Sequence, residues 1–267
     1  MTYRTILVDL TADGPVEARL DVARSLTSRF EAVLVGVHVV PELSTPLPIW
    51  EGGGSVYIQP EVIEAQRKVN QEAKERARAA FDRACGADPK ATWREAEGDP
   101  VRLLAEAAHA SDLVITSRGG ALGTAEQLVT ATGVPVLVLP PEMPRDFGGV
   151  VLVAWKGSPE AARAVHEALP FLQHTANRVV LCTVGEEAGV NAAAMMLERH
   201  GVAVHPELVD RTEGKSTGEI LLAQATAHGA DLLVMGAYGH ARMYELVFGG
   251  VTRHVLREAR LPVLFSG

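Results

Sequence analysis

Short, mostly apolar runs alternate with longer segments of helical periodicity, and the same alternation occurs twice along the chain. Runs such as residues 6–10 and 151–155 have the length and apolar content of buried strands. Residues 61–85 instead repeat apolar side chains at near-helical spacing, and the glycine at position 86 provides a helix stop. Strands that alternate with helices in this way are typical of α/β folds with mostly parallel sheets.

The two halves of the chain repeat each other. Residues 6–10 correspond to 151–155, residues 111–116 correspond to 230–235, and each half closes with a Pro-Val-Leu strand. The expected strands are residues 6–10, 32–40, 111–116, 134–139, 151–155, 178–184, 202–209, 232–236 and 261–265. The expected helices are residues 15–28, 61–85, 159–172, 191–200 and 219–228, a short one after 123, and one that opens near 251. The repeat predicts two domains, residues 1–141 and 147–267, joined by a proline-rich linker at 140–144.

The composition narrows the range of functions. The chain has 267 residues, 47% of them hydrophobic, and a net charge of −8, which argues against a broad nucleic-acid-binding face. No window approaches the roughly 18 apolar residues of a membrane span, and residues 1–9 enter a strand without a secretory pattern. The two cysteines and the nine scattered histidines lack metal-ligand spacing. We therefore expect a cytoplasmic protein without a metal site.

A glycine pattern near the C-terminus marks the candidate site. Gly236 and Gly239 follow an apolar strand, and Gly249 and Gly250 precede the helical pattern at residues 251–256. Glycine lets a backbone approach a phosphate closely, and a helix start offers unpaired N–H groups and a positive dipole end. The pattern fits an oxyanion cradle, and each glycine pair by itself also fits plain turn chemistry.

With this spacing the chain resembles the universal stress proteins, whose nucleotide-binding members carry Gly-x2-Gly-x9-Gly followed by Ser or Thr. The three glycines of that motif match Gly236, Gly239 and Gly249. The resemblance covers essentially the whole chain. It implies two tandem doubly wound, Rossmann-like domains, each with a mostly parallel five-stranded sheet and flanking helices. The domains would pack about a pseudo-twofold axis through their closing strands, which are otherwise exposed edges.

The resemblance also implies a ligand, namely ATP or another adenine nucleotide, with or without Mg²⁺. It assigns the second-half glycines to the phosphate and ribose end, and Val184 to the base. The expected nucleotide-binding residues are Ala154, Trp155, Lys156, Val184, Gly236, Gly239, His240, Gly249, Gly250, Val251 and Thr252. Of these, His240 fits a surface histidine equally well, because its position after the glycine loop is the only reason to place it near a phosphate.

Two positions depart from the family pattern. Gly250 stands where the family has a hydroxyl residue, so one hydrogen bond to phosphate is lost while the backbone N–H remains. Lys156 stands where the family commonly has an acidic residue; an ammonium cannot hold Mg²⁺ or accept from a ribose, but it can attract a phosphate. Lys156 also fits a solvated loop lysine.

The first half differs from the second in the region of the glycine pattern. Asp112 to Pro135 spans 23 positions and Asp231 to Pro262 spans 31, so the x9 spacing is absent despite Gly119 and the glycines at 120 and 123. We expect a degenerate nucleotide loop there. Residues 41–60 form a proline- and glycine-containing insertion, interpreted as a surface loop and a candidate lid.

The leading hypothesis is a universal stress protein whose C-terminal domain binds an adenine nucleotide in a stress response. We find no Gly-x-Ser-x-Gly elbow and no nucleophile–base pair, so no catalytic residue is expected and at most weak nucleotide hydrolysis. The alternative is a nucleotide-free interaction or scaffold protein that acts through dimer and partner contacts. Two chains, each an intramolecular pseudo-dimer, could also associate into a homodimer, and the protein partner is not identified by the sequence.

Overall fold

The computed structural model describes residues 2–11, 14–42, 60–119, 124–142, 147–185, 189–237 and 250–267. Each half alternates strands and helices, as the sequence predicts. The first half contains β1 (Thr5–Asp9), α1 (Val16–Phe30), β2 (Val33–Pro41), α2 (Pro60–Cys85), β3 (Ala91–Gly98), α3 (Pro100–Ala108), β4 (Leu113–Ser117), α4 (Thr124–Ala131) and β5 (Val136–Leu139). The second contains β6 (Val150–Trp155), α5 (Pro159–His174), β7 (Arg178–Val184), α6 (Val190–Arg199), β8 (Val204–Val209), α7 (Thr217–Ala227), β9 (Leu232–Gly236), α8 (Gly250–Glu258) and β10 (Val263–Ser266).

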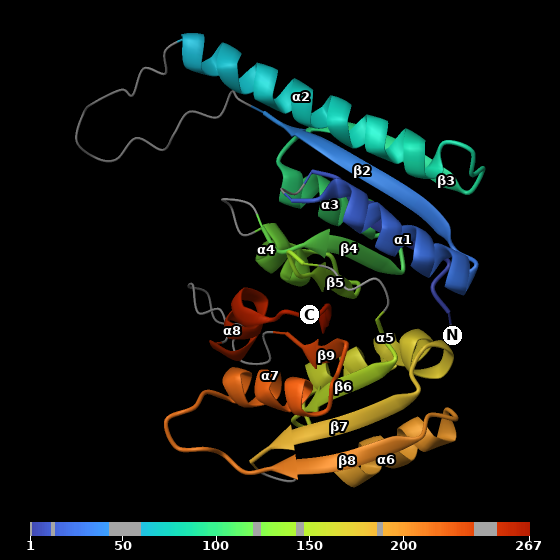
Figure 1. Cartoon of the computed structure of the whole chain (residues 1–267), viewed down its shortest axis with the longest axis vertical. Helices are drawn as coiled ribbons and strands as arrows, with labels where there is room; N and C mark the ends of the chain where they lie inside the picture. The colour runs from blue at the N-terminus through green and yellow to red at the C-terminus, as the bar shows by residue number, and fades with distance from the viewer. Residues whose placement is uncertain are drawn as a thin grey trace.

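The strands form one continuous sheet in the order β3-β2-β1-β4-β5-β10-β9-β6-β7-β8. Neighbouring strands within each half are parallel, and strand order reverses beside β1 in the first half and beside β6 in the second. The α/β fold with two tandem, mostly parallel five-stranded units is therefore confirmed. Figure 1 shows the two halves stacked along the long axis of the molecule.

The halves meet where their closing strands pair. Strands β5 and β10 are antiparallel, with Leu137 opposite Leu264 and Val136 opposite Phe265. The predicted contact between the two Pro-Val-Leu strands is confirmed, and it protects two edges that would otherwise be open to other chains.

Both faces of the sheet carry a core that crosses this junction. On one face, residues of α1, α2, α5 and α6 pack together, and on the other, residues of α3, α4, α7 and α8 do so. An aromatic cluster joins the halves on the first face, where the rings of Tyr3 and Phe30 lie 5.7 and 5.5 Å from that of Phe171. Burial raises the pKa of the Tyr3 hydroxyl well above its usual value, with Glu167 adding to the effect.

Some sequence expectations need correction or fall outside the described residues. Strand β3 and helix α3 were not predicted, and they complete the first half. The candidate lid lies mostly outside the described ranges, as does the linker beyond residue 142. No helix in the described ranges is long and apolar enough to span a membrane.

Candidate functional site

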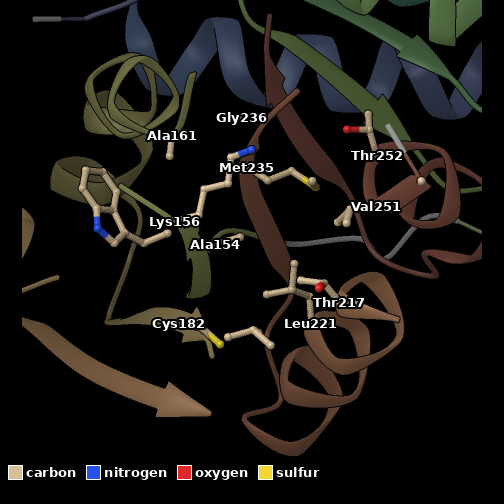
Figure 2. Close-up of a pocket in the computed structure, with 13 residues that line it drawn as sticks. Ala154, Lys156, Ala161, Cys182, Thr217, Leu221, Met235, Gly236, Val251 and Thr252 are labelled. Atoms are coloured by element: carbon tan, nitrogen blue, oxygen red, sulfur yellow. The ribbon is translucent and has the colours of Figure 1, made fainter. Parts of the chain in front are cut away.

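A cavity of about 250 Å³ lies at the carboxyl ends of β6, β7 and β9, in the second half of the molecule. In open α/β sheets this is where ligands bind, because the strand order reverses there and leaves a crevice. Helices α5, α7 and α8 begin around it (Figure 2). It is lined by Ala154, Trp155, Lys156, Ala161, Cys182, Val184, Thr217, Leu221, Met235, Gly236, Gly250, Val251 and Thr252. Its volume is slightly below the ~300–1,000 Å³ of typical small-molecule pockets.

Helix caps fix two of the helix starts. At α7, the Ser216 hydroxyl accepts from the Glu219 N–H at 3.2 Å and the Glu219 carboxylate accepts from the Ser216 N–H at 2.7 Å. This capping box satisfies two N–H groups that the helix itself leaves unpaired, and it lowers the pKa of Glu219. At α5, the Ser158 hydroxyl accepts from the Ala161 N–H at 3.3 Å, and Pro159 follows at the first helical position. Because of these caps, the first turns of both helices hold a fixed position at the pocket.

One wall of the cavity is apolar. Cys182 and Val184 point to the same face of β7, because side chains alternate along a strand. Burial, with a smaller contribution from Glu207, raises the pKa of the Cys182 thiol to about 12. The thiol is therefore protonated near neutral pH and acts as a small apolar group rather than a nucleophile. Leu221 and Met235 extend this wall from α7 and β9.

The opposite end of the cavity is formed by glycines and a lysine. Figure 2 shows Lys156 and Gly236 among the residues that line the cavity. A Cβ on Gly236 would lie 2.5 Å from the Glu160 carbonyl carbon, so the close approach of β9 to α5 requires glycine. Gly250 has no such neighbour within 4 Å and opens α8 at the cavity.

The cavity brings together every expected site residue that the structure describes: Ala154, Trp155, Lys156, Val184, Gly236, Gly250, Val251 and Thr252. Gly239, His240 and Gly249 lie outside the described ranges, as does Tyr238. Sequence reasoning missed Ala161, Cys182, Thr217, Leu221 and Met235. The period of two from Val184 could have found Cys182, and the spacing of one helical turn links Thr217 to Leu221.

The corresponding place in the first half is filled by buried polar side chains. Strand register matches Asp9 to Ala154 and Thr116 to Met235. The Asp9 carboxylate accepts from the Thr116 hydroxyl and from the Thr11 N–H, each at 2.8 Å, and both Asp9 and Thr116 are fully buried. The buried Arg19 guanidinium donates to the hydroxyl of Ser117, which corresponds to Gly236. Hydrogen-bonded polar groups therefore stand in the first half where the second half has Ala154, Met235 and Gly236.

The chain is similar to known proteins in sequence over less than a third of its length and in fold over nearly all of it. Residues 186–266 match the model of the Universal stress protein family. A universal stress protein from Synechocystis sp. is 37% identical over 78 residues, which are 29% of this chain and 25% of that protein. This chain therefore matches only about a quarter of that relative's length.

Two solved structures match nearly the whole chain. A universal stress protein from Archaeoglobus fulgidus shares 18% identity, covers 98% of this chain and 95% of its own, and has a TM-score of 0.74. A putative universal stress protein from Pseudomonas aeruginosa shares 14% identity, covers 99% of this chain and 93% of its own, and has a TM-score of 0.59. At 18% and 14% identity, the similarity to these two structures shows that this chain shares their fold.

Proposed function

We propose that this chain, whose residues 186–266 match the Universal stress protein family, binds an adenine nucleotide in the cavity at β6, β7 and β9. The observation that carries the proposal is the convergence of Lys156, Val184, Gly236 and Gly250 on one cavity. These residues come from four separate segments of the chain, the ends of β6, β7 and β9 and the start of α8.

The two ends of the cavity suit the two ends of a nucleotide. The apolar side chains of Val184, Leu221 and Met235 form a surface against which a base can pack without leaving polar groups unpaired. The start of α8 at Gly250 offers backbone N–H groups and the positive end of a helix dipole to a phosphate. Gly239, Gly249 and His240 belong to the proposed site as the rest of the glycine pattern.

The first half acts as a structural or regulatory partner in this proposal. Its buried Asp9 and Thr116 stand where the second half has Ala154 and Met235. We propose domain boundaries at residues 1–141 and 147–267, and a stoichiometry of one nucleotide per chain. Ligand binding would then shift a conformational population that a partner protein reads.

Calorimetric titration with ATP, ADP and adenosine tests the proposal. Val184→Trp places a large ring in the cavity and should weaken binding at least tenfold, because the base loses the space beside β7. Val40→Trp, also at a half-buried strand position but in the first half, is the matched control and should leave binding unchanged. The proposal fails if millimolar ATP, ADP and adenosine give neither heat nor a thermal shift with the unmodified protein.

The second candidate is an interaction module that works without a ligand. Lys156 and Gly250 favour it, because both depart from the residues of nucleotide-binding relatives. Under this alternative, Val184→Trp and the unmodified protein give identical, empty titrations.

A further inference from the structure

We infer that the cavity takes the nucleotide polyphosphate without a divalent metal ion, and that the Lys156 ammonium occupies the role of that cation. This inference rests on the proposed function and goes beyond it, because it names the ionic form of the ligand and the residue that selects it. It follows from the position of Lys156 and from the state of the carboxylates around the cavity.

Lys156 lies where it can meet a phosphate. It follows β6 and lines the same cavity as Gly236, the residue that begins the glycine pattern (Figure 2). The first turn of α8 lines the same cavity through Gly250 and Thr252. A phosphate at this end would therefore be within the field of both an ammonium and a helix dipole.

Carboxylates are absent from the cavity lining among the described residues. Two acidic side chains stand at the nearby helix starts, and neither lines the cavity, although Oε2 of Glu160 is buried without a hydrogen-bond partner among the described residues. Glu219 is held by the capping box of α7. The pKa of Glu160 is lowered chiefly by a hydrogen bond from its own backbone N–H and, to a lesser degree, by Ser158, Arg163 and Lys156. Within the described ranges, no cluster of three or more metal-ligating side chains occurs.

This arrangement disfavours a bridging metal ion. Proteins hold Mg²⁺ through one or two carboxylates together with the substrate phosphates, and the described lining offers none. The Lys156 ammonium repels a second cation at the same place, yet it attracts the full charge of a bare polyphosphate. Bound Mg²⁺ would cancel part of that charge, so it should compete with the protein for the ligand rather than assist binding.

The first test compares the affinity for ATP in excess EDTA with that in saturating Mg²⁺, by calorimetry at fixed ionic strength. We expect metal-free ATP to bind at least as tightly as the Mg²⁺ complex. Binding that is more than twofold tighter in Mg²⁺ overturns the inference while leaving the proposed function in place.

The second test removes the ammonium. In EDTA, Lys156→Gln should weaken ATP binding about tenfold to a hundredfold, the range expected for one charge-assisted hydrogen bond, while adenosine binding changes less than twofold. Lys90→Gln, an exposed lysine of the first half, removes the same charge away from the cavity and is the control. An ATP loss of threefold or less, or an equal loss for adenosine, overturns the inference.

The tests separate the two claims. If adenosine and ATP bind equally well and Lys156→Gln changes neither, the cavity is a nucleoside site and the inference alone fails. If neither ligand binds the unmodified protein, the proposed function and the inference fail together.

Discussion

Gly250 and Gly236 both line the cavity, but the structure gives them different constraints. At Gly236 an added Cβ would meet the backbone of α5 at 2.5 Å, so glycine is needed there for packing whatever the ligand. At Gly250 an added Cβ meets no atom of the described residues within 4 Å, so these residues leave space for a hydroxyl side chain. The two glycines therefore differ: packing requires glycine at position 236, and no described residue requires it at position 250.

Gly250→Ser should tighten ATP binding by about fivefold to tenfold, because its hydroxyl can donate to a phosphate oxygen at the start of α8. Calorimetry of the two proteins side by side measures the change. Gly250→Ala adds the same Cβ without the hydroxyl, so it is the control for helix propensity and for lost backbone freedom. An affinity for Gly250→Ser no greater than that of Gly250→Ala would contradict the phosphate position that we propose.

Among the residues that line the cavity, sequence reasoning found those that carry a local signal and missed those placed by packing. Glycines and Lys156 stand out because their residue types depart from the surrounding pattern. Leu221 and Met235 are ordinary core residue types, so nothing local separates them from neighbours that face away from the cavity. Leu221 lines the cavity because α7 packs across the ends of the strands.

Helix α8 connects the cavity to the other half of the molecule. Its first turn lines the cavity, and its last carbonyls face Arg118, which follows β4 in the first half. The Arg118 guanidinium donates to the Arg257 carbonyl and, at 3.0 Å, to the Ala259 carbonyl. A cation at a helix C-terminus satisfies carbonyls that the helix leaves unpaired and complements its dipole.

Arg118→Ala should lower the free energy of unfolding by about 1–3 kcal/mol, because it leaves two carbonyls without a charged donor. Urea denaturation followed by circular dichroism measures the change. Arg102→Ala removes an exposed arginine that pairs with Glu106 on the same helix, and it should cost about 0.5 kcal/mol or less. Equal effects of the two substitutions would mean that Arg118 does not hold α8 in place.

Most elements could be predicted because their apolar spacing is regular. Predicted residues 178–184 coincide with β7, and predicted residues 61–85 differ from α2 by one residue at the start. Strand β3 was not predicted because it is an edge strand in which Arg94, Glu95 and Glu97 interrupt the apolar pattern. It forms a strand through its pairing with β2. Asp99 and Pro100 did carry the cap and first-turn signal of α3.

At the scale of the whole molecule, two similar halves share one sheet but differ in the side chains at the carboxyl ends of their strands. The second half has an apolar cavity with Lys156 at one end. The first half has hydrogen-bonded Asp9 and Thr116 at the matching positions. The shared cores and the β5–β10 pair tie the halves into one unit.

Methyl NMR of the full chain, titrated with ATP in EDTA, tests this asymmetry and the binding site together. We predict that the methyl signals of Val184, Leu221 and Val251 shift and saturate at one nucleotide per chain. Val39 and Leu104 are the first-half counterparts of Val184 and Leu221, matched through strand register and helix caps. Their methyl signals should not shift. Shifts at Val39 and Leu104 without shifts at Val184 and Leu221, or no shift at any of them, would contradict it.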